Sequence, residues 1–274
     1  MKIIKGGVTS PIGFLANGIK AGIKKSGRKD LALVCSEVPA IAAAAFTNNK
    51  FQASPIKVSR LHLKNKTHQA IIVNSGNANC ANGKIGDRDA LSMAELLAEA
   101  LSVDKEEVLV ASTGVIGKYL PINKIKGKVP ELVNGLSEKG GIPFSESIMT
   151  TDTTRKALAV TFKIGDSTVT IGGACKGVGM IYPEMKTERH ATLLCFLTTD
   201  VSISRKMLED ALGEAIGGSL NMISVDGDMS TNDSCFIMAN GLAGNKRISA
   251  KGRDYALFLN ALQLLVKNFA RMLV

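Results

Sequence analysis

Short apolar runs separated by polar, glycine-rich segments dominate the hydrophobic pattern of the chain. Runs of three to six apolar residues predict buried strands; they lie at 31–35, 71–73, 108–110, 193–197, 222–225 and 235–239. Two further runs, 160–164 and 169–171, flank Gly165 and Asp166 and predict a hairpin. The stretch 38–46 contains four consecutive alanines, and its pattern leaves helix and strand open.

Three segments instead carry apolar residues at helical spacing. Asp87 is expected to cap the first helix, which then places Leu91, Ala94, Leu97, Ala98 and Leu101 on one face. Ser204 is expected to cap the second, with Met207, Leu208, Ala211, Leu212, Ala215 and Ile216 facing inward. The third, 255–274, is predicted to be buried on most sides. Strands mixed with helices indicate an α+β fold of layered sheets covered by helices.

The composition narrows the class of protein. With 274 residues and 45% hydrophobic content, the chain can form one large domain or two closely packed lobes. The formal net charge is +10, but the lysines are scattered and aromatics make up only 4%. We therefore expect no nucleic-acid partner, and we expect the basic surface to attract carboxylate substrates. No apolar run is long enough to span a bilayer and no signal-peptide pattern is present, so we expect a cytoplasmic protein without a membrane partner.

Cysteine and histidine positions argue against a metal site. The five cysteines form no C-x-x-C pair, and the three histidines show no ligand spacing. We expect buried thiols and no metal or other cofactor. The loop at 226–237 only superficially resembles a calcium loop, because its sixth residue is Thr231 and its twelfth is Ile237.

The stretch 176–200 carries the most informative chemistry. Lys176-Gly-Val-Gly-Met180 and Pro183 predict a loop, and the apolar run that follows predicts a strand. Thr192 lies at this junction, where a hydroxyl on a rigid strand faces a flexible loop. On its own, a threonine that opens a strand is usually a β-branched residue in its preferred conformation.

These residues resemble the central motif of the ornithine acetyltransferase (glutamate N-acetyltransferase) family of arginine biosynthesis. The shared pattern is Lys-Gly-x-Gly-Met, a proline, then Ala-Thr before an apolar strand that ends Thr-Thr-Asp. The resemblance implies self-cleavage between Ala191 and Thr192, which gives an α-chain-like part, 1–191, and a β-chain-like part, 192–274. Thr192 would then carry the acetyl group from N-acetylornithine to glutamate, with acetyl-CoA as a second substrate in bifunctional members. An α2β2 heterotetramer is also implied.

Further roles follow from the same resemblance. It implies that Thr113 and Gly114 form the oxyanion hole and that Thr150, Lys176 and Thr192 contact substrate. Without it, the Thr113-Gly114 pair reads as an ordinary strand-ending turn, and Lys176 reads equally well as a surface lysine. The freed α-amine of Thr192, with an ordinary pKa of roughly 7.7–8.0, would serve as the base that the hydroxyl needs.

Two departures from the family pattern leave alternatives open. Residues 186–190 form an apparent insertion, so Lys186-Thr187 competes with Ala191-Thr192 for the cleaved bond. The chain also ends before the acidic, glycine-rich segment of the family, as a fragment would. The alternatives are a Thr-nucleophile amidohydrolase or aminopeptidase that uses water, and an inactive protein that only binds.

Overall fold

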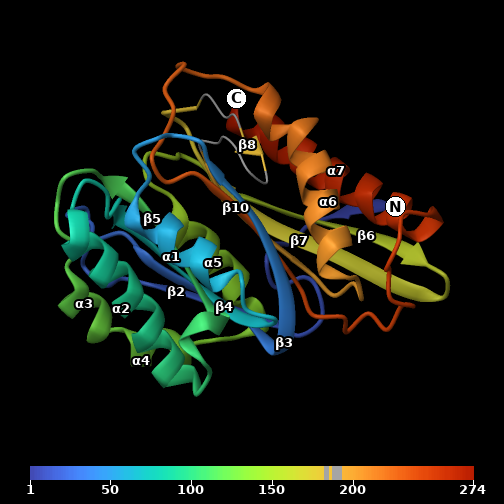
Figure 1. Cartoon of the computed structure of the whole chain (residues 1–274), viewed down its shortest axis with the longest axis horizontal. Helices are drawn as coiled ribbons and strands as arrows, with labels where there is room; N and C mark the ends of the chain where they lie inside the picture. Colours follow the sequence, from blue (N-terminus) through green and yellow to red (C-terminus); the bar gives the residue numbers. More distant parts are fainter. Residues whose placement is uncertain (182–184, 187–192) are drawn as a thin grey trace.

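A single ten-stranded sheet organises the chain (Figure 1). The computed structural model describes residues 1–181, 185–186 and 193–274, the pair 185–186 as backbone only. The strands are β1 (Lys2–Ile4), β2 (Phe14–Ile19), β3 (Leu31–Thr47), β4 (His68–Asn77), β5 (Val108–Val115), β6 (Lys156–Ile164), β7 (Ser167–Lys176), β8 (Met185–Lys186), β9 (Leu194–Thr199) and β10 (Ser234–Ala239). Their order is β1-β6-β7-β9-β10-β3-β4-β5, and β2 and β8 each pair with β3.

The long strand β3 connects two parts of this sheet. Residues 31–36 pair antiparallel with β2, and residues 31–35 also pair with β4. Residues 41–46 pair with β10. Ala43 and Ala45 belong to one apolar cluster, whereas Ala42 and Phe46 belong to another. The undecided stretch 38–46 is therefore strand, because both of its faces are covered and alanine lets the layers approach closely.

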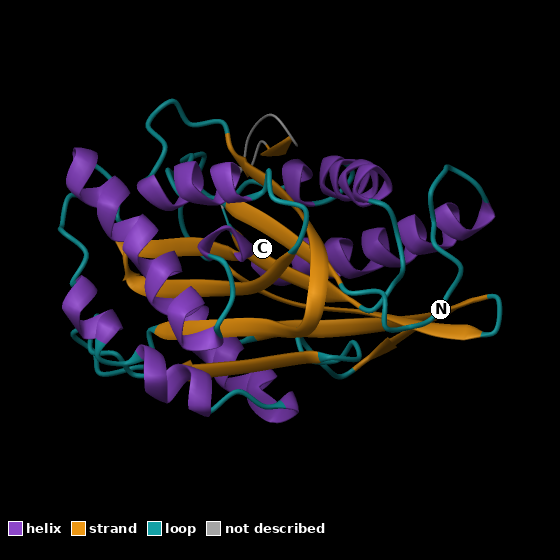
Figure 2. Ribbon diagram, turned by 60° about the horizontal axis from the view of Figure 1, so that its bottom comes forward, coloured by secondary structure: helices purple, strands orange, loops and turns teal. Residues whose placement is uncertain are grey.

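Helices cover the outer faces of the strands (Figure 2). The α-helices are α1 (Ser54–His62), α2 (Gly83–Leu101), α3 (Ile122–Lys126), α4 (Val129–Asn134), α5 (Gly141–Ile148), α6 (Arg205–Gly217) and α7 (Arg253–Leu273), and the 3₁₀ turns are η1 (Lys105–Glu107), η2 (Glu138–Gly140) and η3 (Leu220–Met222). One apolar cluster joins α6 and α7 to β6, β7, β9 and β10. A second joins α2, α3 and α4 to β2–β5.

A third cluster combines residues from both parts of the sheet. Phe144 of α5 meets Phe196 of β9 edge-on at 5.4 Å between ring centroids, and Phe196 stacks on Phe236 of β10 at 5.7 Å. Phe14 of β2 and Val73 of β4 join the same cluster. This shared core fixes how the two parts of the sheet lie, and with them the strand ends that carry the candidate site.

Several predicted elements are confirmed. The runs 160–164 and 169–171 belong to the β6–β7 hairpin. Ser204 Oγ accepts a hydrogen bond from the Met207 amide at the start of α6, at 3.4 Å, and its six inward residues are buried. The C-terminal helix also forms as α7. Its buried residues, however, make one stripe from Tyr255 to Leu273, so the expectation of burial on most sides is wrong.

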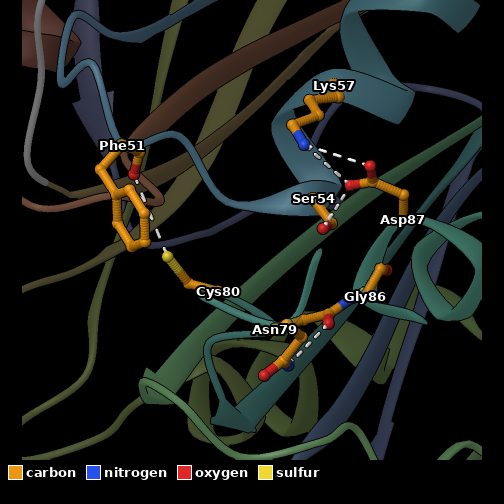
Figure 3. Close-up of polar contacts among 8 residues, drawn as sticks. Phe51, Ser54, Lys57, Asn79, Cys80, Gly86 and Asp87 are labelled. Atoms are coloured by element: carbon orange, nitrogen blue, oxygen red, sulfur yellow. Dashed lines mark hydrogen bonds and ion pairs between the residues drawn. The ribbon is translucent and has the colours of Figure 1, made fainter. Parts of the chain in front are cut away.

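Two local predictions are also wrong. Asp87 does not cap α2, because the helix begins at Gly83. Its carboxylate instead accepts hydrogen bonds from Ser54 Oγ at 2.6 Å and Lys57 Nζ at 3.0 Å, which connects α2 to α1 (Figure 3). The run 222–225 forms no strand either. Met222 is the last residue of η3, and residues 223–225 belong to the loop that follows it.

Within the described residues, no helix is long and apolar enough to cross a membrane. The same part of the chain holds no cluster of His, Cys, Asp or Glu side chains suited to a metal ion. All five cysteines are free and buried, as expected. Burial raises the pKa of the Cys35 thiol to about 11, so that thiol stays protonated and unreactive near neutral pH.

Candidate functional site

Thr113 and Gly114 lie near the end of β5, inside the strand rather than after it. In the parallel register with β4, Ser75 faces Thr113 and Gly76 faces Gly114. Gly114 has φ +132°, and a Cβ atom on it would lie 2.5 Å from the carbonyl carbon of Gly76. Only glycine fits here. Thr113 is 9% exposed, and within the described residues its hydroxyl has no hydrogen-bond partner.

Lys176 is the last residue of β7 and pairs in register with Leu194 of β9. Its Nζ donates a hydrogen bond to Thr150 Oγ1 at 3.3 Å. Burial lowers the pKa of the Lys176 ammonium, while the nearby carboxylates of Asp152 and Asp233 act to raise it. Two of the predicted substrate contacts therefore touch: Lys176 at the end of β7, beside β9, and Thr150 in the loop between α5 and β6.

Asp226 holds the glycine-rich loop that follows Lys176. Its carboxylate accepts hydrogen bonds from the backbone amides of Met180 at 2.5 Å and Ile181 at 2.7 Å. Val225 N in turn donates to Ile181 O at 2.6 Å. Desolvation raises the pKa of the Asp226 carboxyl, but hydrogen bonds from backbone amides outweigh it. The net effect lowers that pKa. The segment 226–237, whose sequence does not fit a calcium loop, thus uses Asp226 to bind backbone amides of this chain.

Asn232 connects the same segment to β5. Its Nδ2 donates to Ala78 O at 2.6 Å and to Ser112 O at 2.8 Å. Ser112 immediately precedes Thr113, and Ala78 follows the asparagine-rich end of β4. Asn232 thereby holds the loop at 226–233 against the strand that carries the Thr113-Gly114 pair.

These elements enclose a small cavity of about 60 Å³. It is lined by Ala78, Thr113, Gly114, Ile116, Lys176, Gly177, Gly179, Met180, Leu193, Leu194, Ser230, Thr231, Asn232 and Asp233. The structure thus brings together Thr113, Gly114 and Lys176, with Thr150 beside Lys176. Ala191 and Thr192 lie outside the described residues, as do residues 187–190, which include the competing Thr187. Leu193, the residue after Thr192, lines the cavity.

Sequence reasoning missed Asp152, Lys156, Asn232 and the role of Asp226. Asp152 sits in the run Thr150-Thr-Asp-Thr-Thr, and an acidic residue among hydroxyls in a loop was the available signal. Asp226 begins the segment 226–237, whose residue spacing carries no signal beyond the rejected calcium pattern. Two larger cavities, of about 630 and 1130 Å³, are both lined in part by Glu146, Met149 and Thr153, and none of the predicted site residues lines either of them.

Comparison with known proteins places the chain among related sequences. The model of the ArgJ family matches residues 15–274. The arginine biosynthesis bifunctional protein ArgJ of Symbiobacterium thermophilum is 45% identical over 99% of this chain, and the glutamate N-acetyltransferase of Methanocaldococcus jannaschii is 44% identical over all of it. The chain spans about two thirds of the length of these relatives, 67% and 65%.

Solved structures of the same family also resemble this chain. The ArgJ protein of Bacillus halodurans is 42% identical with a TM-score of 0.64, and its chain matches 67% of this one over 98% of its own length. Ornithine acetyltransferase of Mycobacterium tuberculosis, solved with ornithine, is 40% identical with a TM-score of 0.63 and the same coverage of 67% and 98%.

A more distant likeness extends across the fold. An aminopeptidase of Ochrobactrum anthropi, described as a variant of the Ntn hydrolase fold, covers 96% of this chain and 85% of its own, with a TM-score of 0.57 at 11% identity. At that identity the likeness concerns the fold alone. Together with the closer structures it confirms the expected α+β fold of sheets covered by helices. On the family match and the identity to curated relatives, the chain belongs to the ArgJ family.

Proposed function

We propose that this protein is an acetyltransferase of arginine biosynthesis that moves the acetyl group of N-acetylornithine to glutamate through an acetyl-Thr192 intermediate. The observation that carries the proposal is the cavity that joins Thr113 and Gly114 of β5 to Lys176 of β7, next to the first residues of β9. Membership of a family whose members include a glutamate N-acetyltransferase supports it.

The nucleophile is made by cleavage of the chain. The Thr192 hydroxyl attacks the carbonyl carbon of Ala191, the peptide C–N bond breaks, and water opens the resulting ester. This leaves a carboxylate on Ala191 and a free α-amine on Thr192. In support, the chains of two solved relatives match only 67% of this chain over 98% of their own length, a share close to that of residues 1–191.

Acetyl transfer then needs a base and an oxyanion site. The α-amine of Thr192 takes the hydroxyl proton as the oxygen attacks the acetyl carbonyl, and it returns that proton to the departing ornithine amine. Thr113 and Gly114 donate hydrogen bonds to the oxyanion of the tetrahedral intermediate. Removal of one such donor raises the barrier by about 2.7–4 kcal/mol. The amine of glutamate next attacks the acetyl ester and regenerates the hydroxyl.

Lys176 and Thr150 hold the substrate. The Lys176 ammonium supplies a positive charge at the cavity wall, where it meets the α-carboxylate of N-acetylornithine or of glutamate. The Thr150 hydroxyl, 3.3 Å from Lys176 Nζ, orients that ammonium. Because glutamate replaces ornithine after the first transfer, one carboxylate site serves both halves of a ping-pong reaction.

Mass spectrometry under denaturing conditions, with N-terminal sequencing, tests the cleavage. Wild-type protein should give two pieces, the second beginning at Thr192. Thr192→Ala should remain one chain, whereas Thr187→Ala should be cut as the wild type is. A new terminus at Thr187 would move the nucleophile into the insertion. An intact wild-type chain that still transfers acetyl groups would refute the amine as base.

Incubation with labelled N-acetylornithine tests the transfer. Label should appear in N-acetylglutamate only when glutamate is present, and denatured protein should carry an acetyl group on Thr192 when it is absent. Release of free acetate regardless of glutamate would instead identify a hydrolase. Acetyl-CoA in place of N-acetylornithine tests the second donor, and native mass measurement tests the expected α2β2 assembly.

A further inference from the structure

A buried carboxylate, Asp152, lies directly behind the cavity wall. It is 2% exposed and sits in the loop between α5 and β6. Its Oδ1 accepts hydrogen bonds from Lys156 Nζ at 2.7 Å and from the Gly177 amide at 2.9 Å. Its Oδ2 accepts one from the Thr150 amide at 3.1 Å. The Asp152 carboxylate thus holds the backbone amide of Thr150 and that of Gly177, the residue after Lys176.

We propose that Asp152 is a positioning residue of the substrate site, which fixes Thr150 and Gly177 relative to Lys176 and places a negative charge close to the Lys176 ammonium. The proposal rests on the proposed function in assigning Lys176 to substrate binding. Asp152 does not line the cavity that holds Lys176, so it acts through its neighbours rather than on substrate.

The carboxylate is built to stay ionised. Burial raises the pKa of Asp152, but hydrogen bonds from Lys156, Gly177 and Thr150 outweigh burial and lower it. The Lys156 side chain is itself only 6% exposed, so the ion pair is shielded from solvent. A buried carboxylate with three donors is costly to protonate, and its charge therefore persists over the working range of pH.

The charges that face Lys176 come from four segments. Asp152 and Asp233, from the loops before β6 and β10, raise the pKa of Lys176, whereas Lys156 at the start of β6 lowers it. Lys24, from the loop after β2, also interacts with Lys176 as a like charge. Loss of the Asp152 charge removes one of the two anions that raise the pKa of Lys176, so we expect that pKa to fall.

The test compares Asp152→Asn with a matched control, Asp200→Asn. Asp200 is another buried aspartate that accepts two backbone hydrogen bonds, from Thr170 at 2.8 Å and Ile12 at 3.1 Å. It follows the far end of β9, about 20 Å along the strand from Leu194 at 3.3 Å per residue. Both substitutions remove one carboxylate, but only the first removes it beside Lys176.

The first readout does not depend on activity. Competitive labelling of amines with isotopic acetic anhydride, followed by peptide mass spectrometry, gives the pH midpoint at which Lys176 becomes reactive. Asp152→Asn should lower this midpoint by about one pH unit, and Asp200→Asn should leave it unchanged. An unmoved midpoint in folded Asp152→Asn, or an equal shift in the control, overturns the proposal.

The second readout separates position from charge. In Asp152→Asn the KM for N-acetylornithine should rise about tenfold with a smaller change in kcat, because the lost arrangement serves binding. Asp152→Glu keeps the negative charge but displaces it, so this variant should keep the labelling midpoint and still raise KM. It also tests the positioning role if the asparagine variant does not fold. Unchanged KM in both variants refutes the positioning role. Absence of transfer in the wild type would refute the proposed function, while the labelling result would stand.

Discussion

The backbone of Gly114 passes so close to Gly76 that a single Cβ atom on Gly114 would lie 2.5 Å from the Gly76 carbonyl carbon and 2.7 Å from the Asn77 amide nitrogen. These atoms are backbone of the neighbouring strand β4, so they cannot move aside as a side chain would. The close contact fixes β5 against β4 at the residues that carry the proposed oxyanion donors.

Gly114→Ala should therefore impair both folding and transfer. Gly117→Ala is a matched control, since Gly117 also has a positive φ, +75°, but nothing within 4 Å of its Cβ position. The control should lose about 1–2 kcal/mol, the ordinary cost of left-handed backbone, in urea unfolding. Gly114→Ala should lose clearly more and abolish acetyl transfer; equal losses in the two variants would contradict the steric account.

Thr113→Val should lower kcat 10²–10³-fold with little change in KM, because an oxyanion donor acts in the transition state. Valine keeps the shape of threonine and removes only the hydroxyl, and Thr113→Ser restores a hydroxyl as a control. Steady-state kinetics of acetyl transfer measure both parameters. If the valine variant changed KM alone, Thr113 would be a binding residue instead.

Lys176→Met should act in the opposite way and chiefly raise KM for N-acetylornithine and glutamate, since methionine keeps most of the stem and removes the charge. Lys163→Met is the control, because the exposed Lys163 ammonium donates to the Asp166 carbonyl at 3.2 Å, in the β6–β7 turn, and lines no part of the cavity. An unchanged KM in Lys176→Met would remove this lysine from the substrate site.

Asp226→Ala should slow cleavage and transfer with little loss of stability. The side chain is exposed, yet it holds the amides of Met180 and Ile181 in the loop that lines the cavity. Asp228→Ala is the control, because Asp228 meets Asp226 only through its own backbone amide, at 3.3 Å. The rate of appearance of the smaller piece on denaturing gels measures cleavage. Equal rates in the two variants would show that the Asp226 carboxylate does not order the loop.

His68 should make the fold sensitive to mild acid. Burial lowers the pKa of this fully buried imidazole to about 4, and the backbone carbonyl of His62, 3.1 Å from Nε2, opposes the shift only in part. Between pH 6.5 and 4 the unfolded chain binds the proton that the folded chain excludes, so stability falls as pH falls, by about 3 kcal/mol.

Urea unfolding at pH 4.5 and pH 7 measures this effect. His68→Gln keeps a donor for the His62 carbonyl but cannot titrate, so its loss of stability in acid should be smaller than that of the wild type. If both lost the same amount, the acid sensitivity would come from other groups.

The sequence alone determined the local elements whose signals lie within one segment. The β6–β7 hairpin and the Ser204 cap follow from short-range turn and capping chemistry, which needs no distant partner. The family motif likewise located Thr113, Gly114, Thr150 and Lys176, which the fold then brought together.

Tertiary structure decided what depends on neighbours far along the chain. The alanine run at 38–46 is strand because β10 pairs with it and apolar layers cover both faces, which alanine by itself does not specify. Asp87 carries a local capping signal, yet it lies inside α2 and not at its start. Its carboxylate accepts hydrogen bonds from Ser54 and Lys57 of α1. Asp152 meets Gly177, 25 residues away, only because β7 returns beside β6. A carboxylate's role is set by the donors that the fold places around it, and no pattern along the chain encodes them.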